Sequence, residues 1–67
     1  MRCKFTLTKE NITKEAEFEE GTPLSDLLFN CGIIPDTVII ELNGRIIPED
    51  EPAEEADYDV VTTASRG

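Results

Sequence analysis

At its centre the chain reads Val38-Ile39-Ile40-Glu41-Leu42-Asn43-Gly44-Arg45-Ile46-Ile47, and this stretch decides the fold. Two runs rich in β-branched residues flank Asn43-Gly44, a dipeptide that favours the two-residue turn whose twist matches that of paired strands. Pro48 ends the second run, because proline has no backbone N–H to donate to a strand ladder. The sequence therefore predicts a β-hairpin over residues 38–47.

Upstream of this hairpin, apolar and polar residues alternate twice, with the period of a half-buried strand. Residues 1–8 form the first alternation and residues 12–18 the second, separated by a turn at residues 9–11. These two segments are predicted to pair as a second hairpin. Lys14 falls on the apolar side of its segment, which indicates an edge strand where an inward charge discourages pairing with other chains.

A short amphipathic helix is predicted between the two hairpins. Thr22 is expected to cap its first amides and Pro23 to take its first position, with Gly32 as the C-terminal stop. The apolar face repeats at spacings of three and four residues, at Leu24, Leu27, Leu28 and Cys31. Phe29 lies off this stripe and is expected to pack under the following loop.

After the central hairpin come an acidic loop, residues 49–57, and a last alternating strand that begins at Tyr58. The resulting order ββαβββ predicts an α+β protein of the β-grasp (ubiquitin-like) class, with one main helix against a mixed sheet of four to five strands. The last strand is expected beside the first. Residues 1–64 are predicted to form a single domain, and residues 65–67 a flexible C-terminal tail.

Composition limits the chemistry that the chain can perform alone. Its 67 residues include no His and only two Cys, so the usual general base and the commonest metal ligand are missing. We therefore expect no enzyme activity of its own, no bound cofactor and no metal. Cys3 and Cys31 occupy apolar positions, for which core packing explains them better than a thioester or a mixed disulfide to a partner.

The formal net charge of −9 limits the partners. The six basic residues form no cluster that could neutralise phosphates, so nucleic-acid binding is disfavoured. Three explanations of the acidity stay open, namely solubility, attraction to a basic surface of another protein, and adaptation to high salt. No segment has the length of a signal peptide or a membrane span, so a cytoplasmic monomer without membrane contact is expected.

Over essentially its whole length the chain resembles the ubiquitin-like β-grasp sulfur carriers of the thiamine and molybdopterin type, and the small archaeal modifier proteins. Three segments carry the resemblance: the helix entry at residues 21–28, the hairpin with Asn43-Gly44 and the trailing Pro48, and the acidic loop that leads into residues 59–64. The hairpin is the more specific signal, because many β-grasp domains share the helix entry.

The resemblance implies that a ubiquitin-activating-like enzyme adenylates the Gly67 carboxylate with ATP. A sulfur-donor enzyme then converts it to a thiocarboxylate, which serves an acceptor enzyme in cofactor synthesis or tRNA thiolation. Ala64, Ser65 and Arg66 would form the arm that reaches into the activating enzyme. The family typically ends in Gly-Gly, so either Arg66 replaces the first glycine or a second glycine follows Gly67.

Two alternatives share this sequence pattern. A protein modifier would use the same activation but end in an isopeptide bond to a lysine of a target protein. A non-covalent β-grasp binding module would use Gly67 only as an ordinary chain end. For a carrier or modifier, docking to the activating enzyme is expected at Ile39 and Val61, which alternation turns away from the helix. The competing reading is that a bulge or a loop buries both.

Overall fold

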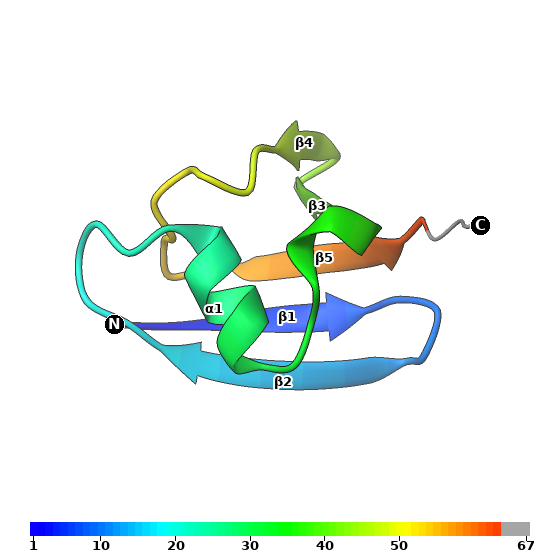
Figure 1. Cartoon of the computed structure of the whole chain (residues 1–67), viewed down its shortest axis with the longest axis horizontal. Helices are drawn as coiled ribbons and strands as arrows, with labels where there is room; N and C mark the ends of the chain where they lie inside the picture. Colours follow the sequence, from blue (N-terminus) through cyan, green and yellow to red (C-terminus); the bar gives the residue numbers. More distant parts are fainter. Residues whose placement is uncertain (64–67) are drawn as a thin grey trace.

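In the computed structural model, which describes residues 1–63, one α-helix lies across a mixed sheet of five strands (Figure 1). The elements follow the predicted order, with a short 3₁₀-helix added before the third strand. In chain order they are β1 (Arg2–Leu7), β2 (Ile12–Glu17), α1 (Leu24–Asn30), η1 (Pro35–Thr37), β3 (Val38–Leu42), β4 (Arg45–Ile47) and β5 (Asp57–Thr62).

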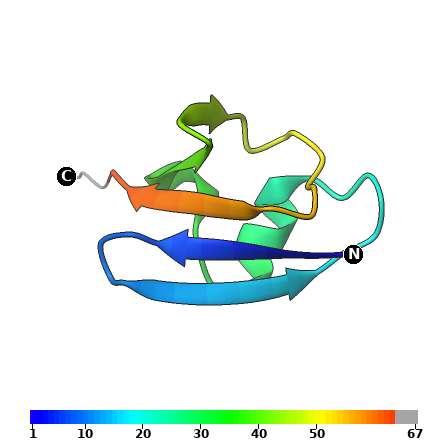
Figure 2. The same cartoon turned by 180° about the vertical axis from the view of Figure 1, so that it is seen from behind.

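The strands are arranged in the order β2-β1-β5-β3-β4. The central strands β1 and β5 run parallel, and the three other neighbouring pairs are antiparallel. Figure 2 shows the sheet from behind, with α1 on its far side. The predicted α+β class and the pairing of the last strand with the first are confirmed, and the fold is β-grasp-like.

The β3–β4 hairpin forms where the Asn-Gly dipeptide predicts it. Asn43 and Gly44 both have positive φ angles, 54° and 81°, as the two central positions of this turn require. The turn sets the register, with Leu42 opposite Arg45 and Ile40 opposite Ile47.

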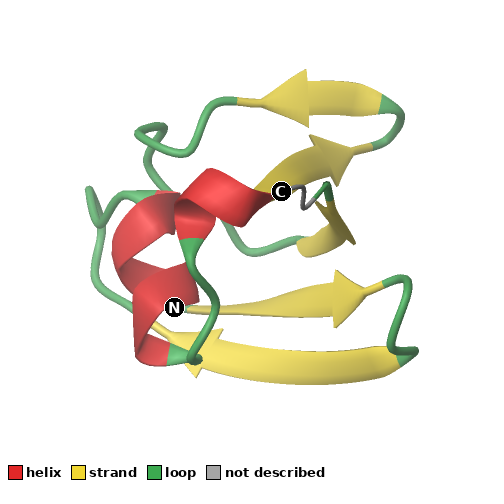
Figure 3. Ribbon diagram, turned by 45° about the vertical axis from the view of Figure 1, so that its right-hand side comes forward, coloured by secondary structure: helices red, strands yellow, loops and turns green. Residues whose placement is uncertain are grey.

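The core lies between α1 and the facing side of the sheet, which we call the inner face (Figure 3). Leu24, Leu27 and Leu28 supply the helix side, as the three- and four-residue spacing predicts. The remaining buried apolar residues come from the strands and the loops: Cys3, Phe5, Phe18, Ile33, Ile40, Ala53, Tyr58 and Val60. Cys3 therefore belongs to the core, and Cys31 packs against it.

The predicted helix start is wrong in two respects. Pro23 is the N-cap of α1 and not its first helical residue, and Thr22 does not cap the helix. The Thr22 hydroxyl donates instead to the carbonyl of Glu19, at 2.7 Å. The acidic loop supplies the caps, because the N–H of Leu24 donates to the Glu51 carbonyl at 2.9 Å and that of Ser25 to the Glu49 carbonyl at 2.8 Å. This loop is thus part of the packed structure as well as a connection.

The last helical residue of α1 is Asn30 and Cys31 is its C-cap, and Gly32 stops the helix as predicted, through a Schellman motif. Gly32 has φ +82° and donates to the Phe29 carbonyl at 3.0 Å, while Ile33 donates to the Leu28 carbonyl at 2.8 Å. The motif turns Ile33 into the core, where it is buried. Phe29 is left on the opposite side of the helix with 70% of its surface exposed, so the prediction that it packs under the loop is wrong.

The strand β2 is an edge of the sheet, as the inward lysine indicated. Lys14 is half-buried, and its Nζ donates to the carbonyl of Cys31 at 3.2 Å. The ammonium group thus binds the C-terminal end of α1, where the helix dipole favours a cation.

Candidate functional site

The proposed reacting residue and its arm lie outside the described residues. Gly67, together with Ala64, Ser65 and Arg66, belongs to the segment 64–67, for which the structure gives no account. The root of this segment is described, because the structure extends through Thr63.

Two hydrogen bonds hold this root. The backbone N–H of Thr63 donates to the carbonyl oxygen of Thr37 at 2.8 Å, and the Thr63 hydroxyl donates to the same oxygen at 3.2 Å. Thr37 is itself tied to the turn of η1, since its hydroxyl donates to the Ile34 carbonyl at 2.7 Å. The chain therefore leaves the sheet from a fixed point between β5 and η1.

The two residues expected to dock a partner lie side by side. Ile39 of β3 is the register partner of Val61 of β5, on the side of the sheet opposite α1, which we call the outer face. The register is continuous over Val38–Glu41 and Asp59–Thr62, so no bulge turns either residue inward. Ile39 is 36% exposed and Val61 is half-buried. The pair lies two residues before the root of the tail.

Sequence reasoning missed a third apolar residue on this face. Ile46 of β4 is 69% exposed and lies opposite Glu41. Glu41 follows Ile39 by two residues on β3, so Ile46 lies on the same face as Ile39. The signal was available in the sequence, because the Asn-Gly turn pairs Ile40 with Ile47 on the inner face. Its neighbour Ile46 must then point outward. We call Ile39, Val61 and Ile46 the apolar patch.

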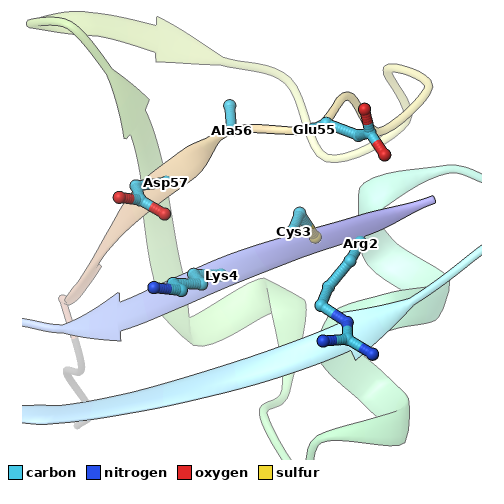
Figure 4. A pocket seen from close by; sticks show the side chains of 6 residues that line it. All are labelled: Arg2, Cys3, Lys4, Glu55, Ala56 and Asp57. Carbon is cyan, nitrogen blue, oxygen red and sulfur yellow. The ribbon is translucent and has the colours of Figure 1, made fainter.

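A hollow of about 350 Å³ lies at the other end of the outer face (Figure 4). Arg2, Cys3 and Lys4 line it from β1, and Glu55, Ala56 and Asp57 line it from the segment that enters β5. Arg2 extends toward β2, where it forms ion pairs with Glu15 and Glu17. The hydrogen bond of Arg2 lowers the pKa of the Glu17 carboxyl.

Cys3 borders this hollow, but its side chain is buried in the core and its thiol is unreactive. Burial raises the pKa of Cys3 from 9.0 to about 11, and the neighbouring Cys31 adds to the rise. A thiol with such a pKa stays protonated at neutral pH and is a poor nucleophile. The hollow therefore offers no activated sulfur, in agreement with the packing role predicted for Cys3.

Within residues 1–63, no three side chains of His, Cys, Asp or Glu lie close enough together to hold a metal ion. Over the same residues, no helix has the length and apolar character that crossing a bilayer requires.

By its fold the chain is a small β-grasp-like α+β protein, with a fixed root for its last four residues and an apolar patch beside that root. A scan of the sequence against models of known protein families finds no match.

Proposed function

We propose that the protein is a ubiquitin-like sulfur carrier whose reacting group is the Gly67 carboxylate. The observation that carries the proposal is the pair of hydrogen bonds from Thr63 to Thr37, which fixes the root of the last four residues beside the apolar patch. Four residues reach at most about 14 Å when fully extended. A partner docked on the patch would thus find the carboxylate within a defined distance.

The partner enzymes supply the reacting groups, so the carrier needs no catalytic residues of its own. A carboxylate oxygen is not displaced at neutral pH, so the partner first joins it to AMP from ATP and releases pyrophosphate. The outer sulfur of a persulfide then attacks the acyl carbon and AMP leaves. A thiol cleaves the resulting acyl disulfide, which releases the thiocarboxylate and a new disulfide. Glycine suits this position, because it has no Cβ to shield the carbonyl carbon.

The test is the intact mass of the protein isolated from its native cells, with the mass of its C-terminal fragment. Replacement of one oxygen by sulfur at Gly67 is the expected result, and the same spectrum shows whether a second glycine follows. A matched control is the chain that ends at Arg66, which should gain no sulfur when ATP and native extract are added.

Three other results would overturn the proposal. Isopeptide conjugates without any thiocarboxylate would identify a protein modifier. An unmodified carboxylate that forms no adenylate, thiocarboxylate or conjugate with ATP and native extract would identify a non-covalent binding module. Sulfur incorporation into the control chain would place the modification elsewhere.

A further inference from the structure

Two carboxylates face each other in the middle of the outer face. Glu41 of β3 is the register partner of Asp59 of β5. Both point away from α1, because their strand neighbours Ile40 and Val60 are buried on the inner face. Residues directly opposite in an antiparallel pair have Cβ atoms about 5 Å apart. Two like charges therefore lie at close range on a sheet surface, an arrangement that destabilises the pairing.

The positions beside this pair do not compensate its charge. Its neighbour on β4 is Ile46, and its neighbour on β1 is Thr6. Lys4 stands one step further along β1, opposite Asp57. Among residues 1–63, the ion pairs within 4 Å both belong to Arg2, at the far end of the face. The carboxylate pair thus adds repulsion without a matching base in the described sheet.

The same pair lies within the apolar patch. Ile46 lies across from Glu41 on one side, and Ile39 and Val61 form the next cross-strand pair toward the tail root. Glu41 as a whole residue is half-buried in this setting. An electrostatic contact formed there is stronger than one on an open surface, because covering the patch lowers the local dielectric constant further.

We infer that the outer face docks a protein whose surface presents an apolar side chain to the patch and a lysine or arginine between Glu41 and Asp59. The inference rests on the proposed function for the identity of that protein as the activating partner. The cation would form charge-assisted hydrogen bonds with both carboxylates and relieve their repulsion. The net charge of −9 would also speed the encounter with a basic surface.

A second copy of this chain is a poor occupant of the face. In a two-fold dimer centred on this face, the same patch meets itself, so the carboxylate pair of one copy would lie close to that of the other. Like charges brought together at an interface oppose binding. The charge pattern therefore selects a different, basic partner.

The test uses three synthetic amphipathic helical peptides with one shared apolar face, flanked by lysine, glutamine or glutamate. Binding to the isotope-labelled chain 1–67 is followed by NMR titration at about 0.15 M salt, where exposed charges more than about 8 Å apart are largely screened. The lysine peptide should shift the amides of the patch and of the carboxylate pair, whereas the glutamate peptide should not bind. The double variant E41Q/D59N should weaken the lysine peptide about tenfold.

The matched control is E49Q/D50N. It removes one Glu and one Asp charge, as E41Q/D59N does, but from the exposed acidic loop. It should leave the affinity for the lysine peptide within about twofold of the parent, since distant exposed charges are screened. Thermal unfolding at low salt is measured in parallel. E41Q/D59N should melt no lower than the parent, because it loses a repulsion, so weaker binding cannot be ascribed to unfolding.

Several outcomes would overturn the inference. These are equal binding of the three peptides, no binding of the lysine peptide, shifts centred on residues 49–57, and equal weakening by both double variants. A lower melting temperature of E41Q/D59N would also overturn it, as would the detection of dimers of the parent chain by light scattering. Peptide binding needs neither ATP nor sulfur, so it can fail while thiocarboxylate is found, and it can succeed while the carrier chemistry is absent.

Discussion

Phe5 and Tyr58 stack across the two parallel central strands, with ring centroids 5.7 Å apart and an angle of 26° between the rings. Both side chains are buried, and the phenolic oxygen of Tyr58 accepts a hydrogen bond from the N–H of Glu54 at 2.9 Å. Tyr58 thus joins the centre of the sheet to the loop that caps α1.

Replacing Tyr58 by Phe should therefore destabilise the protein without disturbing the stack. The variant leaves the Glu54 N–H without its acceptor at a partly buried place, which costs about 1 kcal/mol of unfolding free energy. For a chain of this size that corresponds to a melting temperature lower by about 4–8 °C. Amide hydrogen exchange at Glu54 should accelerate. An unchanged melting temperature and unchanged exchange would show that the hydrogen bond contributes nothing.

Cys3 should make the stability depend on pH above 9. Its pKa is about 11 in the folded chain against 9.0 ordinarily, so the folded state holds the thiol proton more tightly. The stabilisation is complete below pH 9 and is lost as pH rises toward 11. Burial also raises the pKa of Tyr58, which acts in the same direction.

The variant C3A isolates the contribution of the thiol. Between pH 9 and 11 the parent should lose of the order of 1 kcal/mol more unfolding free energy than C3A does. Chemical denaturation at several pH values measures the difference, and C31A serves as the second cysteine control. Parallel curves for the parent and C3A would contradict the prediction.

Much of this fold was readable from local patterns. The Asn43-Gly44 turn, the apolar stripe that begins at Leu24 and the helix stop at Gly32 each depend on a few neighbouring residues, and each lies where the sequence predicts it. Lys14 likewise marks the edge strand by its own position in an alternating run. Such features need no knowledge of which distant segments meet.

The features that were missed depend on distant segments. Thr22 was the best local candidate to cap α1, but the bridge between Pro23 and Pro52 brings the carbonyls of the acidic loop over the helix start. The carboxylate pair of Glu41 and Asp59 likewise exists only through the register of β3 with β5, two strands that no short turn connects. Neither could be derived from alternation.

The turn of the central hairpin should tolerate glycine but not alanine. Gly44 has φ +81°, where a Cβ meets backbone strain, so G44A should cost about 1–2 kcal/mol. The control N43G places glycine at φ +54°, which glycine adopts freely, and should change the stability far less. Urea denaturation of both variants measures the difference. Equal stabilities of G44A and N43G would argue against the strain.

The hydroxyl of Thr63 should matter more for activation than for folding. T63V keeps the backbone hydrogen bond to Thr37 and removes only the exposed one at 3.2 Å, so it should cost less than about 1 kcal/mol. If the proposed function holds, a looser tail root presents Gly67 less well, and ATP-dependent thiocarboxylate formation should slow about threefold or more.

The matched control for this variant is T8V. Thr8 also follows a central strand and donates its backbone N–H across the sheet, to the Val60 carbonyl at 3.1 Å, but it lies at the end of β1 rather than at the tail root. The loss of the Thr8 hydroxyl in T8V should leave the rate of thiocarboxylate formation unchanged. Rates are read by mass spectrometry of the C-terminal fragment after ATP and native extract are added. Equal rates for T63V and T8V would mean that the Thr63 hydroxyl does not position the tail, because the two variants differ only in which strand end loses its hydroxyl.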